Sequence, residues 1–249
     1  MDISKNLNDA LNYAKKMFDD LGRLVVLIVL GVIPIVNFAV MGYAARVLKT
    51  SPKANRPPML EGYVDMWIQG LKIAVVTVIY MIIPILILGA GIVSVVTGIF
   101  GAGFGNLIRQ GGWKGGPDTW DPSVWKDFGM FASPAFIGFG ALLIIIGLII
   151  IFIILLIHLI GISNMIKKDN LGKAFAFSEI FNIVGKIGWG SYILWLIIMF
   201  VLFIIVSGLR AIPGIGWIVM AIIFPVFLVF LGRALGSMYE IGAKTRTKK

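Results

Sequence analysis

The chain has 249 residues, of which 59% are hydrophobic and only 14% charged, with no cysteine and a single histidine. The lack of cysteine excludes disulfides, zinc–thiolate sites, iron–sulfur clusters and cysteine nucleophiles, and one histidine excludes a multi-histidine metal site within the chain. The apolar residues lie in long blocks, and the net charge of +10 comes from basic residues scattered near the block ends. This pattern indicates an integral membrane protein and argues against a nucleic-acid partner.

Residues 3–21 are expected to form an amphipathic helix. Apolar side chains recur there at steps of three and four residues: Ile3, Leu7, Leu11, Ala14, Phe18 and Leu21. Such a stripe lies on a membrane surface or packs against other helices, and the sequence leaves both possibilities open. Acidic residues are spread through the segment, so we do not expect a cleavable signal peptide, which begins with a short basic region and an apolar run.

Residues 24–48 form the first apolar block, with Pro34 and Asn37 at its middle. At ~1.5 Å per residue the block is long enough to cross a ~30 Å hydrocarbon core once. Proline removes a backbone donor and clashes with the preceding turn, so a helix kinks or breaks at Pro34. The block is therefore expected to be either a single span or a re-entrant hairpin whose tip lies at Pro34–Asn37.

The rest of the chain alternates between apolar spans and amphipathic segments. Residues 57–70 are expected to form an interfacial helix, and residues 71–100 a span that contains Pro84. The stretch 101–130 is rich in glycine and tryptophan and is expected to be an extracytoplasmic loop. The remaining elements are predicted at 135–162 (span), 171–188 (interfacial helix), 190–209 (span) and 217–239 (span). Together these elements are interpreted as one membrane domain over residues 1–249.

The distribution of lysine and arginine predicts the topology, because the more basic side of a membrane protein faces the cytoplasm. Segments 42–72, 163–188 and 233–249 carry 5, 4 and 5 basic residues, while the N-terminal segment carries four and the outward loops carry four. A hairpin at 24–48 places the N-terminus inside and splits the charges 18 to 4, whereas a single span splits them 14 to 8. We therefore expect the hairpin, four full spans and both termini in the cytoplasm.

Several stretches of the chain carry a resemblance to a known family. The first is VIPIVNFAVMGYAARVLK at residues 32–49, and it continues at 62–84, 173–193 and 212–240. These stretches resemble a prokaryotic, mostly archaeal, family of small polytopic membrane proteins, the domain-of-unknown-function family numbered four thousand and thirteen. The stretch 101–130 departs from the pattern. The resemblance implies a membrane fold and an archaeal-like sequence, and it supplies no reaction, substrate, cofactor or catalytic residue.

Two polar residues within apolar segments are candidate ligand-binding or transport residues. His158 lies near one end of the 135–162 span, and an ionisable group inside a membrane is by default a candidate functional group. No Asp or Glu lies near the centre of a predicted span, so a proton relay would lack partners, and a neutral histidine bonded near the interface is the competing interpretation. Asn37 could bind an ion or substrate at a broken helix, or its side chain could cap the helix that follows.

Two further groups of side chains are candidates for contacts at the membrane surface. Arginines at span ends clamp lipid phosphates or anchor the topology by reaching toward the head groups, and three lie there: Arg46, Arg210 and Arg233. The tryptophans of the 101–130 loop form either a contact surface for a partner or an aromatic belt on the bilayer: Trp113, Trp120 and Trp125.

The sequence thus predicts an all-α fold: a polytopic helical membrane bundle with an N-terminal re-entrant or short helical hairpin, four full spans and amphipathic interfacial helices. No nucleophile–base pair, metal motif or cofactor motif is recognisable, so neither an enzyme nor a cofactor is expected. We expect a multi-pass protein of the cell membrane, an accessory or organising component that binds membrane lipids, a partner membrane protein or a second copy of itself. The alternative is a small transporter or channel that uses proline-broken helices around Asn37 and Pro84.

Overall fold

The computed structural model describes residues 2–109 and 133–244, the stretch 102–109 by its backbone alone. Every regular element in these ranges is a helix, which confirms the predicted all-α fold. The α-helices are α1 (Ile3–Lys15), α2 (Leu21–Val32), α3 (Phe38–Thr50), α4 (Tyr63–Arg109), α6 (Pro134–Lys168), α7 (Phe177–Ile187), α8 (Trp189–Gly208) and α9 (Gly216–Ala243). Three short 3-10 segments accompany them: η1 (Lys16–Asp19), η2 (Leu171–Phe175) and η3 (Leu209–Ala211).

Four of the described helices are long and apolar enough to cross a membrane. They are the helical stretches Tyr63–Gly101, Pro134–Lys168, Trp189–Ala211 and Gly216–Ala243. Their mean hydropathy over 18 residues lies between 2.5 and 3.5, and their lengths of 23 to 39 residues exceed the ~20 residues that a span needs. The chain is therefore a multi-pass membrane protein, with the four long apolar helices that the sequence predicts.

The described helices group into two compact units, whereas one membrane domain over residues 1–249 is predicted from the sequence. Unit 1 comprises Met1–Ile79 and Leu155–Lys249, and unit 2 comprises Tyr80–Ile154. Helices α4 and α6 each contribute one part to each unit.

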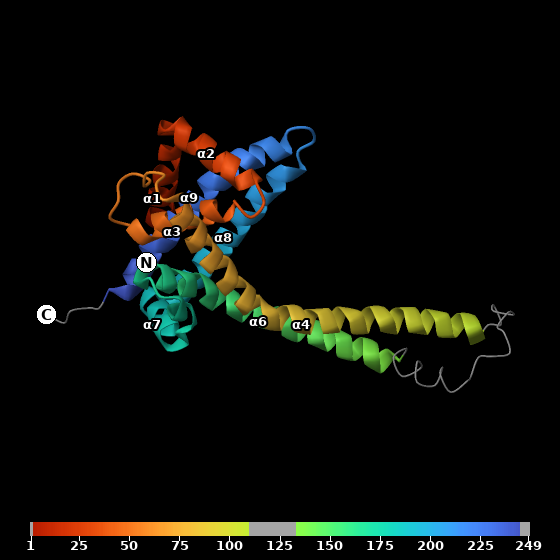
Figure 1. Cartoon of the computed structure of the whole chain (residues 1–249). Helices are drawn as coiled ribbons and strands as arrows, with labels where there is room; N and C mark the ends of the chain where they lie inside the picture. The colour runs from red at the N-terminus through yellow and green to blue at the C-terminus, as the bar shows by residue number, and fades with distance from the viewer. Residues whose placement is uncertain (1, 110–132, 245–249) are drawn as a thin grey trace. The chain divides into compact units, whose positions relative to one another are not determined.

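Helix α9 is the centre of unit 1. It packs against α1, α2, α3, α7 and α8, which surround it in Figure 1. Two glycines bring its backbone close to α3: a methyl group at Gly232 would lie 2.6 Å from the Ala44 carbonyl oxygen, and one at Gly236 would lie 2.6 Å from the Leu48 carbonyl oxygen. Small residues at such crossings let helices approach closely, which is the usual packing device of membrane bundles.

The block 24–48 folds as two short helices, α2 and α3, joined by a turn at residues 33–37. At ~1.5 Å per residue, helices of 12 and 13 residues reach ~18–20 Å, so neither crosses a ~30 Å core. The Asp20 side chain caps α2 by accepting a hydrogen bond from the Arg23 amide at 3.0 Å, and this bond lowers the pKa of Asp20. In the turn, Ile35 adopts a left-handed backbone with φ of 69°. Residues 24–48 thus have the form of a short helical hairpin, and no single helix runs through the block.

The N-terminal segment forms α1 and η1 instead of one helix over 3–21, and its buried face shares only Ala14 with the predicted stripe. The buried residues are Asn6, Ala10, Tyr13, Ala14 and Met17. By contrast, the stripe residues Leu11 and Phe18 are each 46% exposed, and Leu21 is 64% exposed. Leu11, Phe18 and Leu21 of the stripe are thus left on the surface of unit 1, while α1 packs against α9.

Helix α4 joins two elements that the sequence analysis separates. The predicted interfacial helix at 57–70 begins only at Tyr63 and continues without interruption into the predicted span at 71–100. Residues 57–62 are not helical, because Pro57 and Pro58 hold the chain extended before the helix begins. Pro84 lies inside α4, which is assigned as one helix through it. The predicted break at this proline is therefore wrong.

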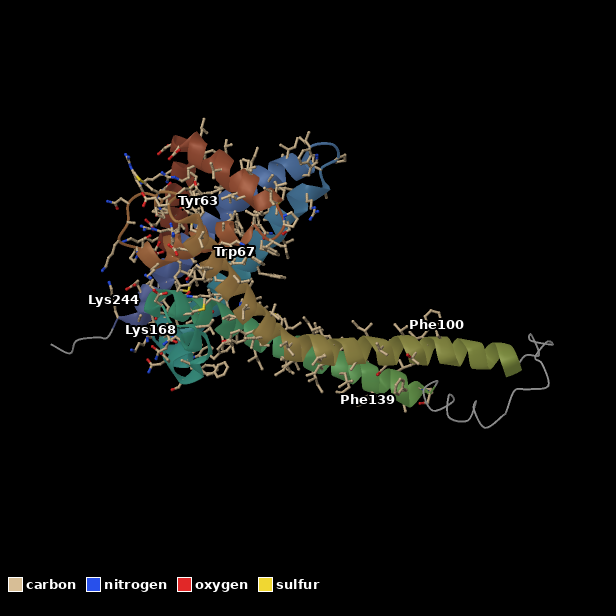
Figure 2. All side chains as sticks on the ribbon, viewed as in Figure 1. Tyr63, Trp67, Phe100, Phe139, Lys168 and Lys244 are labelled. Carbon is tan, nitrogen blue, oxygen red and sulfur yellow. The ribbon has the colours of Figure 1, made fainter. Side chains whose placement is uncertain are left out.

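Unit 2 consists of two helix segments that lie side by side, the second part of α4 and the first part of α6 (Figure 1). A methyl group at Gly91 would lie 2.9 Å from the Gly140 carbonyl oxygen, and one at Gly140 would lie 2.8 Å from the Gly91 carbonyl oxygen. The outward side chains are apolar, and Phe100 and Phe139 project from the pair at 74% and 52% exposure (Figure 2). An exposed apolar surface of this extent matches contact with acyl chains.

Candidate functional site

The two polar candidates of the apolar segments lie in unit 1 and do not meet at either of its two described cavities. On α6, His158 places Nε2 3.0 Å from the Thr77 hydroxyl, which itself donates to the Ile73 carbonyl at 2.8 Å. A hydroxyl has one proton, so with that proton on Ile73 the histidine Nε2 is the donor to Thr77. Asn37 stands at the N-cap position of α3, but its side chain makes no capping bond, so the predicted cap is wrong.

Arg233 is buried in unit 1, with 5% of its surface exposed. Its guanidinium binds both carboxylate oxygens of Asp9 at 2.6 and 3.2 Å and donates to the Ala54 carbonyl at 2.8 Å. It also lies over the Tyr13 ring, 4.6 Å from the centroid. Burial raises the pKa of Tyr13 against the opposing effect of the Arg233 charge. Through these contacts Arg233 joins α9 to Asp9 and Tyr13 of α1 and to the connecting segment at Ala54. The side chain is therefore an internal link of unit 1.

The other predicted surface residues are placed differently. Arg46 donates to the carbonyl oxygens of Glu61 and Gly62, the second at 3.1 Å, and so holds the start of α4. Arg210 is exposed in η3 between α8 and α9, as expected for a residue at a span end. The predicted tryptophan surface lies outside the described residues: Trp113, Trp120 and Trp125.

Residues 51–62, which we call the connector, link α3 to α4 and are held by side chains from most of unit 1. The donors to its carbonyl oxygens are Tyr13 (to Arg56), Lys16 (to Asn55), Arg23 (to Pro57), Tyr43 (to Pro58), Arg46 (to Glu61 and Gly62), Lys167 (to Ser51) and Arg233 (to Ala54). A segment without regular secondary structure needs partners for its backbone polar groups, and these donors provide them. The basic residues that set the charge pattern therefore also order the connector.

Tyr43, which donates to the connector, is expected to make the protein less stable at alkaline pH. It is 1% exposed and donates to Pro58 at 2.8 Å, and burial raises its pKa from 10.0 to about 12. The unfolded phenol ionises near pH 10 while the folded one keeps its proton, so the contribution of Tyr43 is complete below pH 10 and is lost as pH rises toward 12. We expect the thermal midpoint of the solubilised protein to fall in this window and to fall less steeply in Tyr43→Phe. Equal slopes in both proteins would contradict this role.

A cavity of about 600 Å³ lies in unit 1, where the end of α6, η2, α7 and the end of α9 border it. Three lysines line it, Lys168, Lys173 and Lys186, together with a single carboxylate, that of Glu179. Glu179 pairs with Lys168 and, at 3.2 Å, with Lys173. The Lys186 side chain is exposed, and its ammonium group makes no hydrogen bond or ion pair among the described residues. Three lysines against one glutamate leave an excess of two positive charges.

Helix α7 presents three faces, and this arrangement positions the cavity. Its buried face packs on α9 through Ile180, Ile183, Val184 and Ile187. A polar row one turn apart lines the cavity: Ser178, Asn182 and Lys186. On another flank Phe181 is 45% exposed, and its ring lies 6.0 Å from that of Trp189, which is 40% exposed at the start of α8. Exposed aromatic rings beside cationic side chains are typical of the membrane–water interface.

A family model described as "Protein of unknown function (DUF4013)" matches residues 25–115 and 121–215 of the chain. No curated protein and no solved structure matches it. The match includes 101–115 and 121–130, so most of the predicted loop follows the family pattern, contrary to the departure inferred from the sequence. The match ends at 215, so the resemblance inferred for the last apolar helix lies largely outside it.

Proposed function

Since the chain belongs to the DUF4013 family, whose description names no function, we propose from its own geometry that it is a non-enzymatic accessory component that binds anionic lipid. The observation that carries this proposal is a recurring surface on unit 1. Two pairs of its elements, α1 with α2 and α7 with the start of α8, pack against α9 and leave both apolar side chains and lysines exposed.

The N-terminal surface continues the predicted apolar stripe from α1 into α2. Its exposed members are Leu11, Phe18, Leu21, Val25, Val29 and Val32, between 46% and 64% exposed. Lys5 and Lys15 are exposed on α1. An apolar row with lysines beside it binds membranes through burial at the boundary of head groups and acyl chains and through attraction to anionic lipids. This combination supports a lipid surface as the contact of α1 and α2.

The second surface is that of α7, where the exposed rings of Phe181 and Trp189 lie 6.0 Å apart. It is connected through η2 to the end of α6, and it leads into α8; α6 and α8 are both candidate spans. A short amphipathic helix between two spans lies where phosphates and glycerol groups are found. The three lysines of the cavity and the rings of Phe181 and Trp189 are therefore suited to the same interfacial layer.

The hairpin form of residues 24–48 supports a topology with both termini in the cytoplasm. With two short helices in place of one span, the distribution of basic residues is the more asymmetric one, 18 to 4. This orientation places the lysine-lined cavity on the cytoplasmic side, where the anionic lipids of a membrane attract basic segments.

The transport alternative has weaker support. Its two proposed breaks were at Pro34 and Pro84, and α4 is one helix through the second. The first break lies in the turn at 33–37, whose side chains are apolar apart from that of Asn37, with Ile33 exposed at 45% and Ile35 at 67%. A polar solute needs several buried polar contacts, whereas this turn offers a single polar side chain.

Lipid retention tests the proposed function. The full-length protein is reconstituted in nanodiscs that contain equal amounts of phosphatidylglycerol and phosphatidylcholine, and the lipids that stay bound on gentle release are counted by native mass spectrometry. We expect phosphatidylglycerol to be retained several-fold over phosphatidylcholine at low salt and less so at 1 M salt, where charges are screened within about 3 Å. Equal retention of both lipids at every salt concentration would refute the proposal, and co-release of a protein partner would favour the partner-binding alternative.

A further inference from the structure

We propose that the cavity lined by Lys168, Lys173 and Lys186 binds the phosphate of an anionic lipid head group. The inference rests on the proposed lipid-binding function and assigns it a site. The cavity volume of about 600 Å³ is sufficient for a phosphate with its glycerol, since small-ligand pockets span ~300–1,000 Å³.

The charge of the cavity selects an anion. Lys168 and Lys173 share the carboxylate of Glu179, so one negative charge faces two positive ones. Lys186 brings a third ammonium, which makes no ion pair among the described side chains. A phosphate would complete this set, because ammonium groups bind phosphate oxygens as point charges and each oxygen accepts hydrogen bonds.

Neutral polar groups lie in register with the free lysine. Ser178, Asn182 and Lys186 are four residues apart in turn, so they follow one another along a single face of α7. All three line the cavity. A hydroxyl, an amide and an ammonium in one row can donate to a phosphate and to the hydroxyls of a glycerol head group.

The position of the cavity favours a lipid over a soluble phosphate compound. Lys168 is the last residue of α6, and Ala243, also at the cavity wall, is the last residue of α9; both helices are candidate spans (Figure 2 labels Lys168). The ends of spans lie at the level of the lipid phosphates. Phe177, 46% exposed, lines the cavity as well and offers an apolar contact beside the charged groups.

The second described cavity of unit 1 is a poorer candidate. Its volume is about 360 Å³, and Arg46, Lys49 and Lys72 are matched there by Asp65 and Asp169. Arg46 is engaged by the connector carbonyls, and Lys49 pairs with Asp169 at 3.4 Å. Its cationic groups are therefore largely neutralised by their neighbours.

Single charge changes test the assignment in both directions. The dissociation constant of dioctanoyl phosphatidic acid is measured by titration calorimetry on the full-length protein in dodecyl maltoside. We expect Lys186→Gln to weaken binding about fivefold, the effect of one lysine near an anionic lipid surface, and Lys168→Gln with Lys186→Gln to weaken it more than tenfold. Glu179→Gln removes the competing carboxylate and is expected to tighten binding about fivefold.

Lys53→Gln is the matched control, because it makes the same change of charge at an exposed connector residue that does not line the cavity. It is expected to leave the dissociation constant unchanged. Unchanged melting of the Lys186→Gln protein confirms that a loss of binding is not a loss of fold, since this side chain makes no bond within the described residues.

Further binding measurements distinguish the ways in which the proposal can fail. The wild-type protein could prefer dioctanoyl phosphatidic acid over dioctanoyl phosphatidylcholine while every variant binds like it. This result would contradict the cavity as the binding site and leave the proposed function standing. Competition by inorganic phosphate at the same concentration would overturn the lipid as the source of the phosphate. If the wild-type protein shows no preference between the two lipids, both the cavity assignment and the proposed function fall.

Discussion

Alanine at Gly42 or Gly70 is expected to destabilise unit 1 by about 3 kcal/mol, at the upper end of overpacking costs. The two glycines lie where α3 crosses the start of α4: a methyl group at Gly42 would overlap the Met66 carbonyl, and one at Gly70 would overlap the Phe38 carbonyl. The obstacles are backbone atoms, which cannot rotate away as a side-chain end does, so the two helices must separate. For a protein of this size the thermal midpoint should fall by about 10 °C.

Gly185→Ala in α7 provides the matched control, because no atom lies within 4 Å of a methyl group built there. Alanine favours helix over glycine by about 1 kcal/mol, so this variant should be neutral or slightly more stable. Thermal unfolding followed by tryptophan fluorescence in detergent measures all three proteins. If Gly42→Ala and Gly70→Ala melt like Gly185→Ala, the close crossing of α3 and α4 is contradicted.

The long helices follow from composition, because an apolar block of this length has few other solutions in a membrane. The span predicted at 190–209 is α8, Trp189–Gly208, and the span predicted at 217–239 lies within α9, Gly216–Ala243. The start of α4 was missed by six residues. Amphipathic periodicity continues through 57–62, but the two prolines there keep the chain out of the helix until Tyr63.

The face of a helix that packs inside was harder to predict than the helix itself. In water the apolar stripe of residues 3–21 would be the packing face, but beside a membrane apolar side chains can face lipid just as well. Helix α1 buries Asn6, whose side chain donates to the Ala234 carbonyl and accepts from the Trp195 indole, both at 3.0 Å. A polar residue with such distant partners carries no local signal of its burial.

The candidate site was missed for a related reason. Lys168, Lys173 and Lys186 belong to the basic segment 163–188, whose charges by themselves indicate only the topology. They are brought together because η2 reverses the chain between α6 and α7 and because α7 docks on α9. No motif spacing records that turn, so neither the cavity nor the role of Glu179 could be inferred before the structure. The connector donors were hidden in the same way among residues counted for charge.

In the ion pair between Asp9 and Arg233, replacing Asp9 is expected to cost more free energy of unfolding than replacing Arg233. The Arg233 side chain is 7% exposed and that of Asp9 46%, so the two charges lose different amounts of hydration. Asp9→Asn leaves a buried guanidinium without its carboxylate, and we expect a cost of about 3 kcal/mol. Arg233→Met leaves a carboxylate that water can reach and one carbonyl, that of Ala54, without its donor, so we expect about 2 kcal/mol.

The double variant distinguishes a buried pair from two independent contacts. Asp9→Asn combined with Arg233→Met removes both charges, and its cost should be smaller than the sum of the single costs by about 1–3 kcal/mol, the coupling of residues in contact. Asp169→Asn is the control, since its ion pair with Lys49 is exposed at both ends and should contribute less than about 1 kcal/mol. Additive single costs, or an Asp9→Asn effect no larger than that of Asp169→Asn, would show that water reaches the guanidinium of Arg233. In that case the contact between α1 and α9 would depend on apolar packing and on the hydrogen bond from Asn6 to the Ala234 carbonyl.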